Sequence, residues 1–173
     1  MAFLGLLYIS LSWALMIDLS GFNGPFLKIS GGRAALLPCI VILCMWVNDT
    51  MAYIVGSLIG KTPLSKISPK KTWEGTVGGI ILCIGAMGWI GSTLGAAGNS
   101  ESSHSNIASY HWYIIAGIAA VMGTLGDLLE SKLKRMAGVK DSGTLMPGHG
   151  GFLDRFDSLL LAVPFVWLYV QLI

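Results

Sequence analysis

The stretch AALLPCIVILCMWVNDTMAYIVGSLI, residues 34–59, decides the fold. It is apolar over more than the roughly 20 residues that a helix needs to cross the hydrocarbon core of a bilayer. The sequence NDT at Asn48–Thr50 interrupts it. An acidic group inside a membrane span is costly and marks a functional site by default. Asp49 is therefore a candidate site residue, which we assign to substrate binding.

Four further segments are long and apolar enough to span a membrane, at residues 2–17, 76–97, 110–129 and 152–173. The chain is 54% hydrophobic and only 12% charged, whereas soluble domains carry roughly a quarter charged residues. Strand periodicity is absent, and open sheets cannot exist in lipid. The first segment has no basic n-region and no clear cleavage site, so we predict a retained span. We expect one all-α membrane domain over residues 1–173, a polytopic transmembrane helix bundle of about five spans.

The loops between these segments differ sharply in charge. Residues 60–75 and 130–151 are rich in lysine and arginine, whereas the loop GNSESSHSNIAS, residues 98–109, has neither. The positive-inside rule places both basic loops in the cytoplasm. A net charge of +2 is too small to indicate nucleic-acid binding.

Acidic residues gather where the last two spans meet the second basic loop. Asp127 lies at the end of the fourth predicted span, and Asp154 and Asp157 lie at the start of the fifth. Their i,i+3 spacing puts Asp154 and Asp157 on one face of a helix. We expect the three carboxylates to converge and bind Mg²⁺, which prefers oxygen ligands together with waters and substrate phosphates. In the alternative interpretation they cap helices and pair with nearby basic residues.

The basic loops carry groups suited to phosphate. SPKKTWEG offers Ser68, Lys70, Lys71 and Thr72 just before the third span, and ammonium and hydroxyl groups beside a helix N-terminus suit phosphate. The second loop adds further cations and the glycine-rich PGHGG around His149. An electrostatic stripe for anionic lipid headgroups would explain the lysines, but not the aspartates among them. The combination favours phosphoryl or nucleotidyl transfer at a membrane.

Two long stretches resemble a known family. SKLKRMAGVKDSGTLMPGHGGFLDRFDS, residues 131–158, closely resembles the signature of phosphatidate cytidylyltransferases, also called CDP-diacylglycerol synthases. NDTMAYIVGSLIGKTPLSKISPKKTWEGTVGG, residues 48–79, is similar to an upstream block of the same family. Members are usually longer, with additional amino-terminal spans before the segment at which this sequence begins.

The resemblance implies a reaction that makes CDP-diacylglycerol and pyrophosphate from CTP and phosphatidic acid with Mg²⁺. It implies a metal centre of Asp127, Asp154 and Asp157, and we also consider a second metal ion and a homodimer. The expected catalytic residues are Lys134, Arg135, Asp141 and His149. The expected substrate-binding residues are Asp49, Ser68, Lys70, Lys71, Thr72, Glu74, Lys140 and Arg155. The expected location is a bacterial inner (plasma) membrane, with the active site facing the cytoplasm.

Two other interpretations stay open. A small cation transporter would line an ion path with Asp49, Asp127, Asp154 and Asp157. A transporter needs acidic groups distributed through the membrane depth, whereas all of these except Asp49 cluster at one predicted interface. A truncated, inactive product that only associates with lipid or a partner is the third interpretation.

Overall fold

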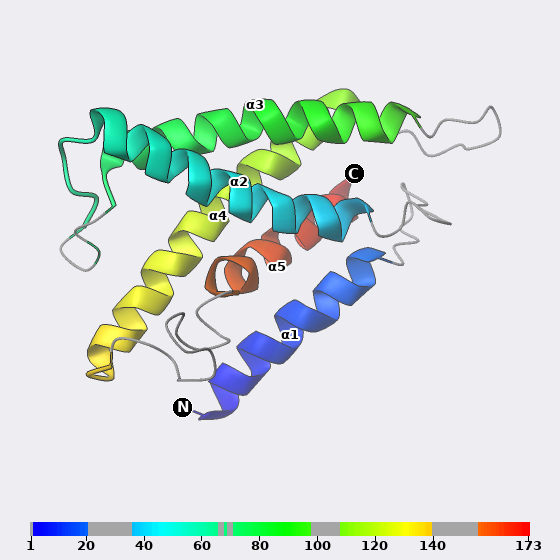
Figure 1. The fold of residues 1–173 in the computed structure, drawn as a ribbon. Helices are drawn as coiled ribbons and strands as arrows, with labels where there is room; N and C mark the ends of the chain where they lie inside the picture. Colours follow the sequence, from blue (N-terminus) through cyan, green and yellow to red (C-terminus); the bar gives the residue numbers. More distant parts are fainter. Residues whose placement is uncertain (1, 21–35, 66–67, 69–70, 98–107, 140–155) are drawn as a thin grey trace, which may run out of the picture.

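The computed structural model of this chain describes residues 2–20, 36–65, 68, 71–97, 108–139 and 156–173. They form five helices: α1 (Ala2–Ser20), α2 (Leu36–Ile59), α3 (Trp73–Ala97), α4 (Ser109–Met136) and α5 (Asp157–Leu172) (Figure 1). The described residues contain no strand, and their only β-type pairing is an isolated bridge between Pro63 and Thr72. The predicted all-α bundle is confirmed.

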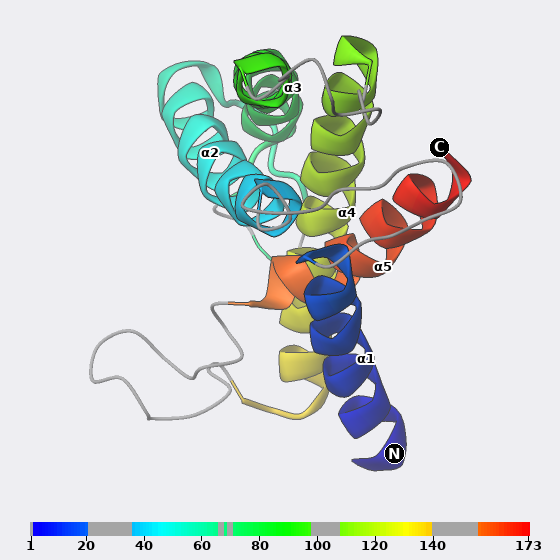
Figure 2. The same cartoon turned by 90° about the vertical axis from the view of Figure 1, so that its right-hand side faces the viewer.

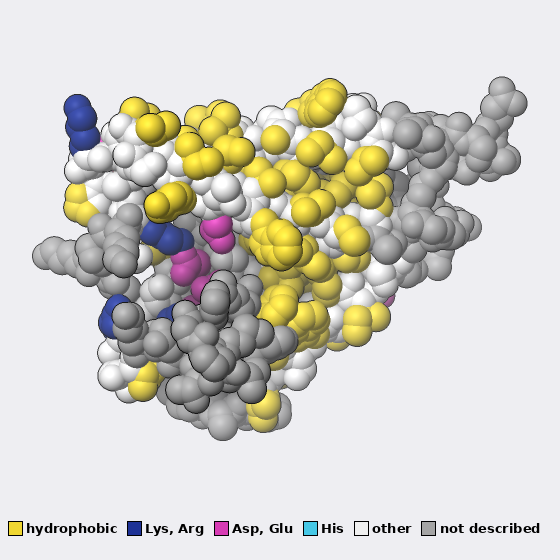
Figure 3. All heavy atoms as spheres, in the orientation of Figure 1, with side chains coloured by type: hydrophobic (Ala, Val, Ile, Leu, Met, Phe, Trp, Pro, Cys, Tyr) yellow, Lys and Arg dark blue, Asp and Glu magenta, His cyan; other side chains and the backbone are white. Residues whose placement is uncertain are grey.

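Length and hydropathy make the bundle a membrane protein. Three helical stretches are long and apolar enough to cross a bilayer, namely Leu36–Ile59, Trp73–Leu94 and Ser109–Met136. The described parts of α1 and α5 give two shorter apolar helices, Gly5–Ser20 and Asp157–Leu172. Large apolar side chains are exposed on the outside, as lipid-facing residues are, and they cover much of the face in Figure 3.

The helices pack in chain order around one apolar core. α2 packs on α3, α3 on α4, and α4 on α5, while α1 lies mainly against α5 (Figure 2). The core is made of small and branched side chains between the helices, including Ile40, Cys44, Cys83, Ile115, Ala119 and Val163.

Glycines set the close approach of α2 and α3. A Cβ atom at Gly79 would lie 2.8 Å from the backbone nitrogen of Ala52, and one at Gly75 would lie 2.8 Å from the Cα atom of Gly56. No side chain fits at either position without moving backbone. Small residues at such spacings let membrane helices pack tightly, and here they bring α3 and the loop before it against the C-terminal part of α2.

α1 stabilises α5 through an unusual backbone contact. Pro164 lies inside α5, and a proline has no N–H to donate to the carbonyl four residues earlier. That carbonyl belongs to Leu160, and it accepts a hydrogen bond of 2.6 Å from the buried Ser12 hydroxyl of α1. The indole Nε1 of Trp167 also donates to the Asp18 carboxylate at 2.6 Å. These contacts fix the position of the helix that begins at Asp157.

Among the described residues, the end of α4 differs most from the predicted spans. α4 continues to Met136, beyond the predicted end at residue 129, so Lys134 and Arg135 lie on a helix. Hydropathy measures the apolar length of a segment, whereas a helix also continues where charged pairs support it. Here Lys134 and Glu130 form an i,i+4 ion pair of 3.4 Å. α5 begins at Asp157, after the N-cap residue Phe156, and residues 152–155 of the predicted fifth span lie outside the described residues.

Candidate functional site

A cavity of about 430 Å³ opens where α2, α4, the start of α5 and the loop before α3 meet. Its lining is mostly polar or small: Asn48, Asp49, Ala52, Tyr53, Gly56, Ser57, Lys71, Thr72, Thr76, Thr124, Asp127, Asp157 and Ser158. Figure 3 shows acidic and basic side chains gathered in one recess beside the apolar surface. Acidic and basic side chains of the described residues therefore meet in this recess, within a bundle of largely apolar helices.

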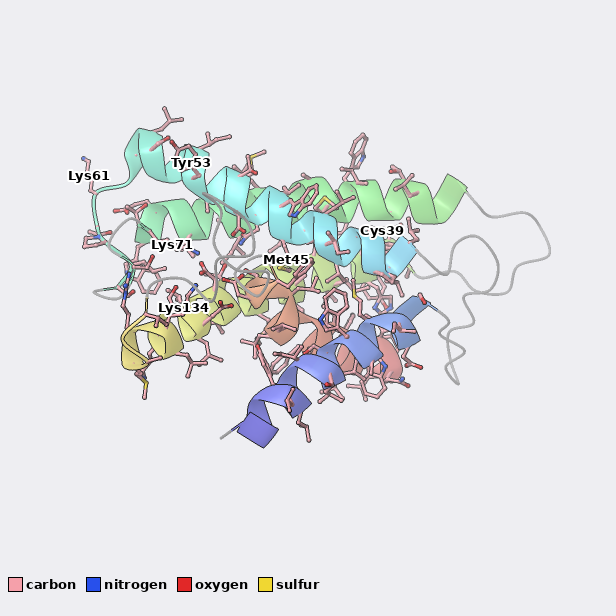
Figure 4. All side chains as sticks on the ribbon, turned by 60° about the horizontal axis from the view of Figure 1, so that its bottom comes forward. Cys39, Met45, Tyr53, Lys61, Lys71 and Lys134 are labelled. Atoms are coloured by element: carbon pink, nitrogen blue, oxygen red, sulfur yellow. The ribbon has the colours of Figure 1, made fainter. Side chains whose placement is uncertain are left out.

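The loop between α2 and α3 folds back on itself and presents Lys71 to this cavity. The amide of Leu64 donates to the Lys71 carbonyl at 2.7 Å, and the amide of Trp73 donates to the Thr62 carbonyl at 3.0 Å. Glu74, in the first turn of α3, accepts a hydrogen bond of 2.7 Å from the Thr62 hydroxyl. Lys71 and Lys134 lie at the same end of the bundle in Figure 4.

Thr72 connects the loop to α3. Its hydroxyl oxygen accepts a hydrogen bond of 3.2 Å from the Gly75 amide, which is the interaction of an N-cap residue. This cap fixes the start of α3 directly after Lys71, so the lysine and the helix N-terminus share one side of the cavity.

Lys71 forms an ion pair with Asp127 of α4. Burial lowers the pKa of the Lys71 ammonium, while the carboxylates of Asp49 and Asp157 act in the opposite direction. The net direction is downward because the ammonium has lost much of its hydration. A phosphate anion bound beside it would compensate for that loss, which makes Lys71 a suitable phosphate contact.

Gly126 lets the start of α5 approach α4. A Cβ atom at this position would lie 2.8 Å from the Asp157 carbonyl oxygen and 3.1 Å from the Cβ atom of Leu161. Asp127 is the next residue on α4, so this contact places the carboxylates of Asp127 and Asp157 on the same cavity. One oxygen of Asp157, Oδ1, accepts hydrogen bonds from the Ser158 amide at 2.6 Å and the Ser158 hydroxyl at 3.1 Å.

The structure brings together only some of the residues predicted from the sequence. Five of them line the cavity: Asp49, Lys71, Thr72, Asp127 and Asp157. Four others are described but lie outside the lining: Ser68, Glu74, Lys134 and Arg135. The remaining six lie outside the described residues: Lys70, Lys140, Asp141, His149, Asp154 and Arg155.

The four that lie outside the lining make local contacts or are exposed. Glu74 holds the loop through Thr62, Lys134 pairs with Glu130, and Arg135 is exposed in the last turn of α4. The Ser68 amide donates to the Ser65 hydroxyl oxygen at 3.2 Å. These contacts explain how the loops are built, while the assignment of the four residues to the reaction stays a prediction.

The cavity lining also contains neutral polar residues that were not predicted, among them Asn48, Thr124 and Ser158. The interruption of the second apolar segment by NDT was a usable signal for Asn48, because an asparagine beside an aspartate has no role on a lipid-facing surface. Threonine and serine are ordinary in membrane helices, so nothing in the sequence alone distinguished the other two.

The cavity suits a divalent cation that is shared with a substrate. Among the described residues, no three histidine, cysteine, aspartate or glutamate side chains are grouped closely enough to hold a metal ion on their own. Magnesium is usually bound by one or two carboxylates together with waters and substrate phosphates. Asp127 and Asp157 on one roomy polar cavity fit that arrangement. The donor atoms of these two carboxylates are all oxygens, which are the ligands that Mg²⁺ prefers.

A smaller apolar recess adjoins the charged cavity. It has a volume of about 150 Å³ and lies between α2 and the start of α5. Apolar side chains form most of its wall, namely Ile42, Met45, Trp46, Phe156 and Leu159, while Asp49, Asp157 and Ser158 also line the charged cavity. Polar and apolar binding surfaces therefore meet at two of the acidic residues.

Known proteins share the segments that build this site. The model of the cytidylyltransferase family matches residues 2–173. A phosphatidate cytidylyltransferase of a Synechocystis strain is 41% identical over 140 residues, which cover 80% of this chain and 44% of that protein. The Bacillus subtilis phosphatidate cytidylyltransferase is 42% identical over 135 residues, covering 78% of this chain and 46% of that protein. The one from Thermotoga maritima is 35% identical over 160 residues, covering 91% and 57%.

The chain spans about half the length of these curated relatives. The family match nevertheless covers all five helices and every described residue that lines the charged cavity. Because the family model matches the chain over residues 2–173, this chain belongs to the cytidylyltransferase family.

Proposed function

We propose that this chain carries the active site of a phosphatidate cytidylyltransferase, which makes CDP-diacylglycerol and pyrophosphate from CTP and phosphatidic acid. The observation that supports it most directly is the cavity itself. Between membrane helices it combines the carboxylates of Asp127 and Asp157, the Lys71 ammonium and an adjoining apolar recess. A reaction that joins a nucleotide to a lipid with the help of a metal ion needs a charged cavity and an apolar surface next to each other. The names of the relatives agree with this activity.

The reaction requires little covalent chemistry from the protein. A phosphate oxygen of phosphatidic acid attacks the α-phosphorus of CTP, the new P–O bond forms, and the bond to the β-phosphate breaks to release pyrophosphate. Mg²⁺, when bound, would neutralise phosphate charge at the attacking and leaving oxygens. Positioning and charge compensation then supply most of the rate acceleration, as in other phosphoryl transfers.

The residues of the cavity have distinct roles in this proposal. Asp127 and Asp157 hold the cation, with Asp154 as a further predicted ligand from outside the described residues. Lys71 binds a phosphate group of CTP, and the N-terminus of α3, capped by Thr72, offers backbone amides to the same anion. The apolar recess between α2 and α5 accepts part of the lipid, so that its phosphate reaches the carboxylate-lined cavity.

The cation-transporter interpretation is less well supported. A cation transporter would have acidic groups at separate depths along a path through the membrane. Asp49, the residue that the sequence sets apart from the other acids, lines the same cavity as Asp127 and Asp157. Among the described residues these three acidic groups share one cavity, which is the arrangement of a binding site rather than of a path.

We further propose that residues 1–173 form one membrane domain, with the basic segments at 60–75 and 130–151 in the cytoplasm of a bacterium and the cavity facing that side. Eight of the eleven lysines and arginines lie in these two segments, and positive charge is retained on the cytoplasmic side. A homodimer stays a prediction.

Single cysteines placed at Ser65 and Ser102 should test this orientation. In a background without Cys39, Cys44 and Cys83, a membrane-impermeant maleimide added to intact cells should label the cysteine at Ser102. Labelling of the cysteine at Ser65 should require permeabilised cells. Labelling of both positions from one side would contradict the orientation.

The activity itself is tested by supplying both substrates. Purified protein incubated with cytidine-labelled CTP, phosphatidic acid and Mg²⁺ should transfer the label to the lipid fraction. Omission of phosphatidic acid should abolish the transfer, because the label enters lipid only when the lipid phosphate attacks CTP.

A further inference from the structure

Asn48 of α2 is the most deeply buried polar side chain on the cavity wall, with 4% of its surface exposed. Its amide nitrogen Nδ2 donates a hydrogen bond of 3.2 Å to the Thr124 hydroxyl oxygen on α4. The single hydroxyl proton of Thr124 is donated to the Ala120 carbonyl at 2.9 Å. Thr124 can therefore only accept from Asn48, and this fixes which end of the amide faces α4.

The other end of the amide has no partner among the described residues. The carbonyl oxygen Oδ1 of Asn48 is buried and accepts no hydrogen bond from any of them, although buried polar groups are almost always paired because desolvation is costly. The Asn48 to Thr124 to Ala120 chain of hydrogen bonds keeps the amide in this orientation. A cost of this kind is maintained where the unpaired group serves a ligand.

The surroundings of this oxygen indicate what the ligand is. The described residues that line the cavity include three carboxylates, from Asp49, Asp127 and Asp157, and one ammonium, from Lys71. The wall therefore has an excess of negative charge and of oxygen acceptors. An anion is repelled by such a wall unless a cation accompanies it, whereas a hard cation is attracted to every one of these oxygens.

We propose that the Asn48 carbonyl oxygen is a neutral ligand of the divalent cation in this cavity, together with Asp127 and Asp157, and that Thr124 is the positioning residue that orients it. This inference rests on the proposed function, because it uses the same cation. It adds a ligand from α2 to the acidic ones from α4 and α5, so that binding of the cation joins three helices. Asparagine carbonyls are common ligands of hard cations.

The test measures Mn²⁺ binding to the purified protein, with and without CTP, from the loss of the free Mn²⁺ signal in electron paramagnetic resonance. Asn48→Leu removes the oxygen and should weaken binding about 10-fold or more, the scale of changes in the ligand shell of a metal. Asn48→Asp keeps an oxygen at this place and should bind at least as tightly as the unmodified protein. Thr124→Val removes the positioning contact and should weaken binding by about 10-fold.

A matched control and two further results make the outcome decisive. Thr93 donates its hydroxyl to the Ile90 carbonyl at 2.9 Å on the exposed side of α3, so Thr93→Val should leave Mn²⁺ affinity unchanged. Thermal unfolding without metal identifies any variant that fails to fold. If Asn48→Leu does not fold, an unchanged affinity in Thr124→Val overturns the inference.

The inference can fail separately from the proposed function. Equal Mn²⁺ affinity in Asn48→Leu and Asn48→Asp would overturn the role of Asn48 alone, provided that Asp157→Asn still weakens binding. No Mn²⁺ binding by the unmodified protein, with or without CTP, would overturn both the inference and the metal dependence of the proposed reaction.

Discussion

Replacing Asp157 by asparagine should lower turnover by about 100-fold or more, comparable to removing a principal electrostatic group from an active site. The two side chains have nearly the same shape, and asparagine keeps one acceptor oxygen for the Ser158 amide that now contacts Oδ1. The change therefore removes the negative charge and little else. Turnover measured over a range of Mg²⁺ concentrations should show the largest loss at limiting Mg²⁺. Mn²⁺, a similar oxygen-seeking ion, should restore part of the rate.

The same substitution elsewhere gives the control. Asp18 lies on α1 and accepts a hydrogen bond from Trp167, an interaction that asparagine can also make, so Asp18→Asn should retain normal turnover. If Asp157 only stabilised the first turn of α5, where it follows the N-cap residue Phe156, asparagine should cost a little stability and leave turnover normal. A folded Asp157→Asn protein with unimpaired turnover at limiting Mg²⁺ would falsify its assignment to the metal.

Replacing Lys71 by alanine should raise the KM for CTP by about 10-fold or more, since hydrogen bonds to charged groups contribute roughly 1.5–3 kcal/mol. Among the described lysines of this loop, Lys71 lines the cavity, where it pairs with Asp127. The loss should fall mainly on CTP rather than on phosphatidic acid if the ammonium binds a nucleotide phosphate. Initial rates measured with each substrate varied in turn separate the two.

Lys61 provides the matched comparison for this change. It lies in the same loop, exposed and away from the cavity lining (Figure 4), so Lys61→Ala should leave both KM values nearly unchanged. Equal, small effects at the two positions would favour the alternative in which the loop only attracts anionic lipid headgroups.

Hydropathy alone was sufficient for the class of fold. Each of the five apolar segments corresponds to a helix, because backbone groups in lipid must be satisfied within a helix or a closed barrel. The ends of the helices were harder to predict from hydropathy. α4 continues past its apolar part through the Glu130–Lys134 pair, and such a charged, partly buried turn has no hydropathy signal.

The site was predictable where charge is conspicuous against an apolar background. Asp49, Lys71, Asp127 and Asp157 stand out in the sequence, and all four line one cavity. That Asp49 joins the others could not be inferred, since its position in the middle of a predicted span suggested a different depth. The close contacts at Gly75 and Gly79, which set how α2 and α3 cross, are a property of three-dimensional packing.

Neutral residues limited the prediction further. Asn48 enters the proposed metal site because its amide donates to Thr124 and its oxygen has no partner among the described residues, and neither fact is visible in a sequence. Conversely, Glu74 is conspicuous in the sequence but holds the loop through Thr62. Charge identifies candidates, whereas the contacts between helices decide which of them meet.

The most direct measurement follows both products of a single reaction. Purified protein is given CTP labelled at the α-phosphate, phosphatidic acid in detergent micelles and Mg²⁺, and lipid-bound label and free pyrophosphate are quantified together. We expect equal amounts of the two products, formed only when phosphatidic acid is present and strongly reduced in Asp157→Asn. Lipid-bound label no higher than in a reaction without protein, from protein that is folded by thermal unfolding and binds Mn²⁺, would contradict the proposed cytidylyl transfer.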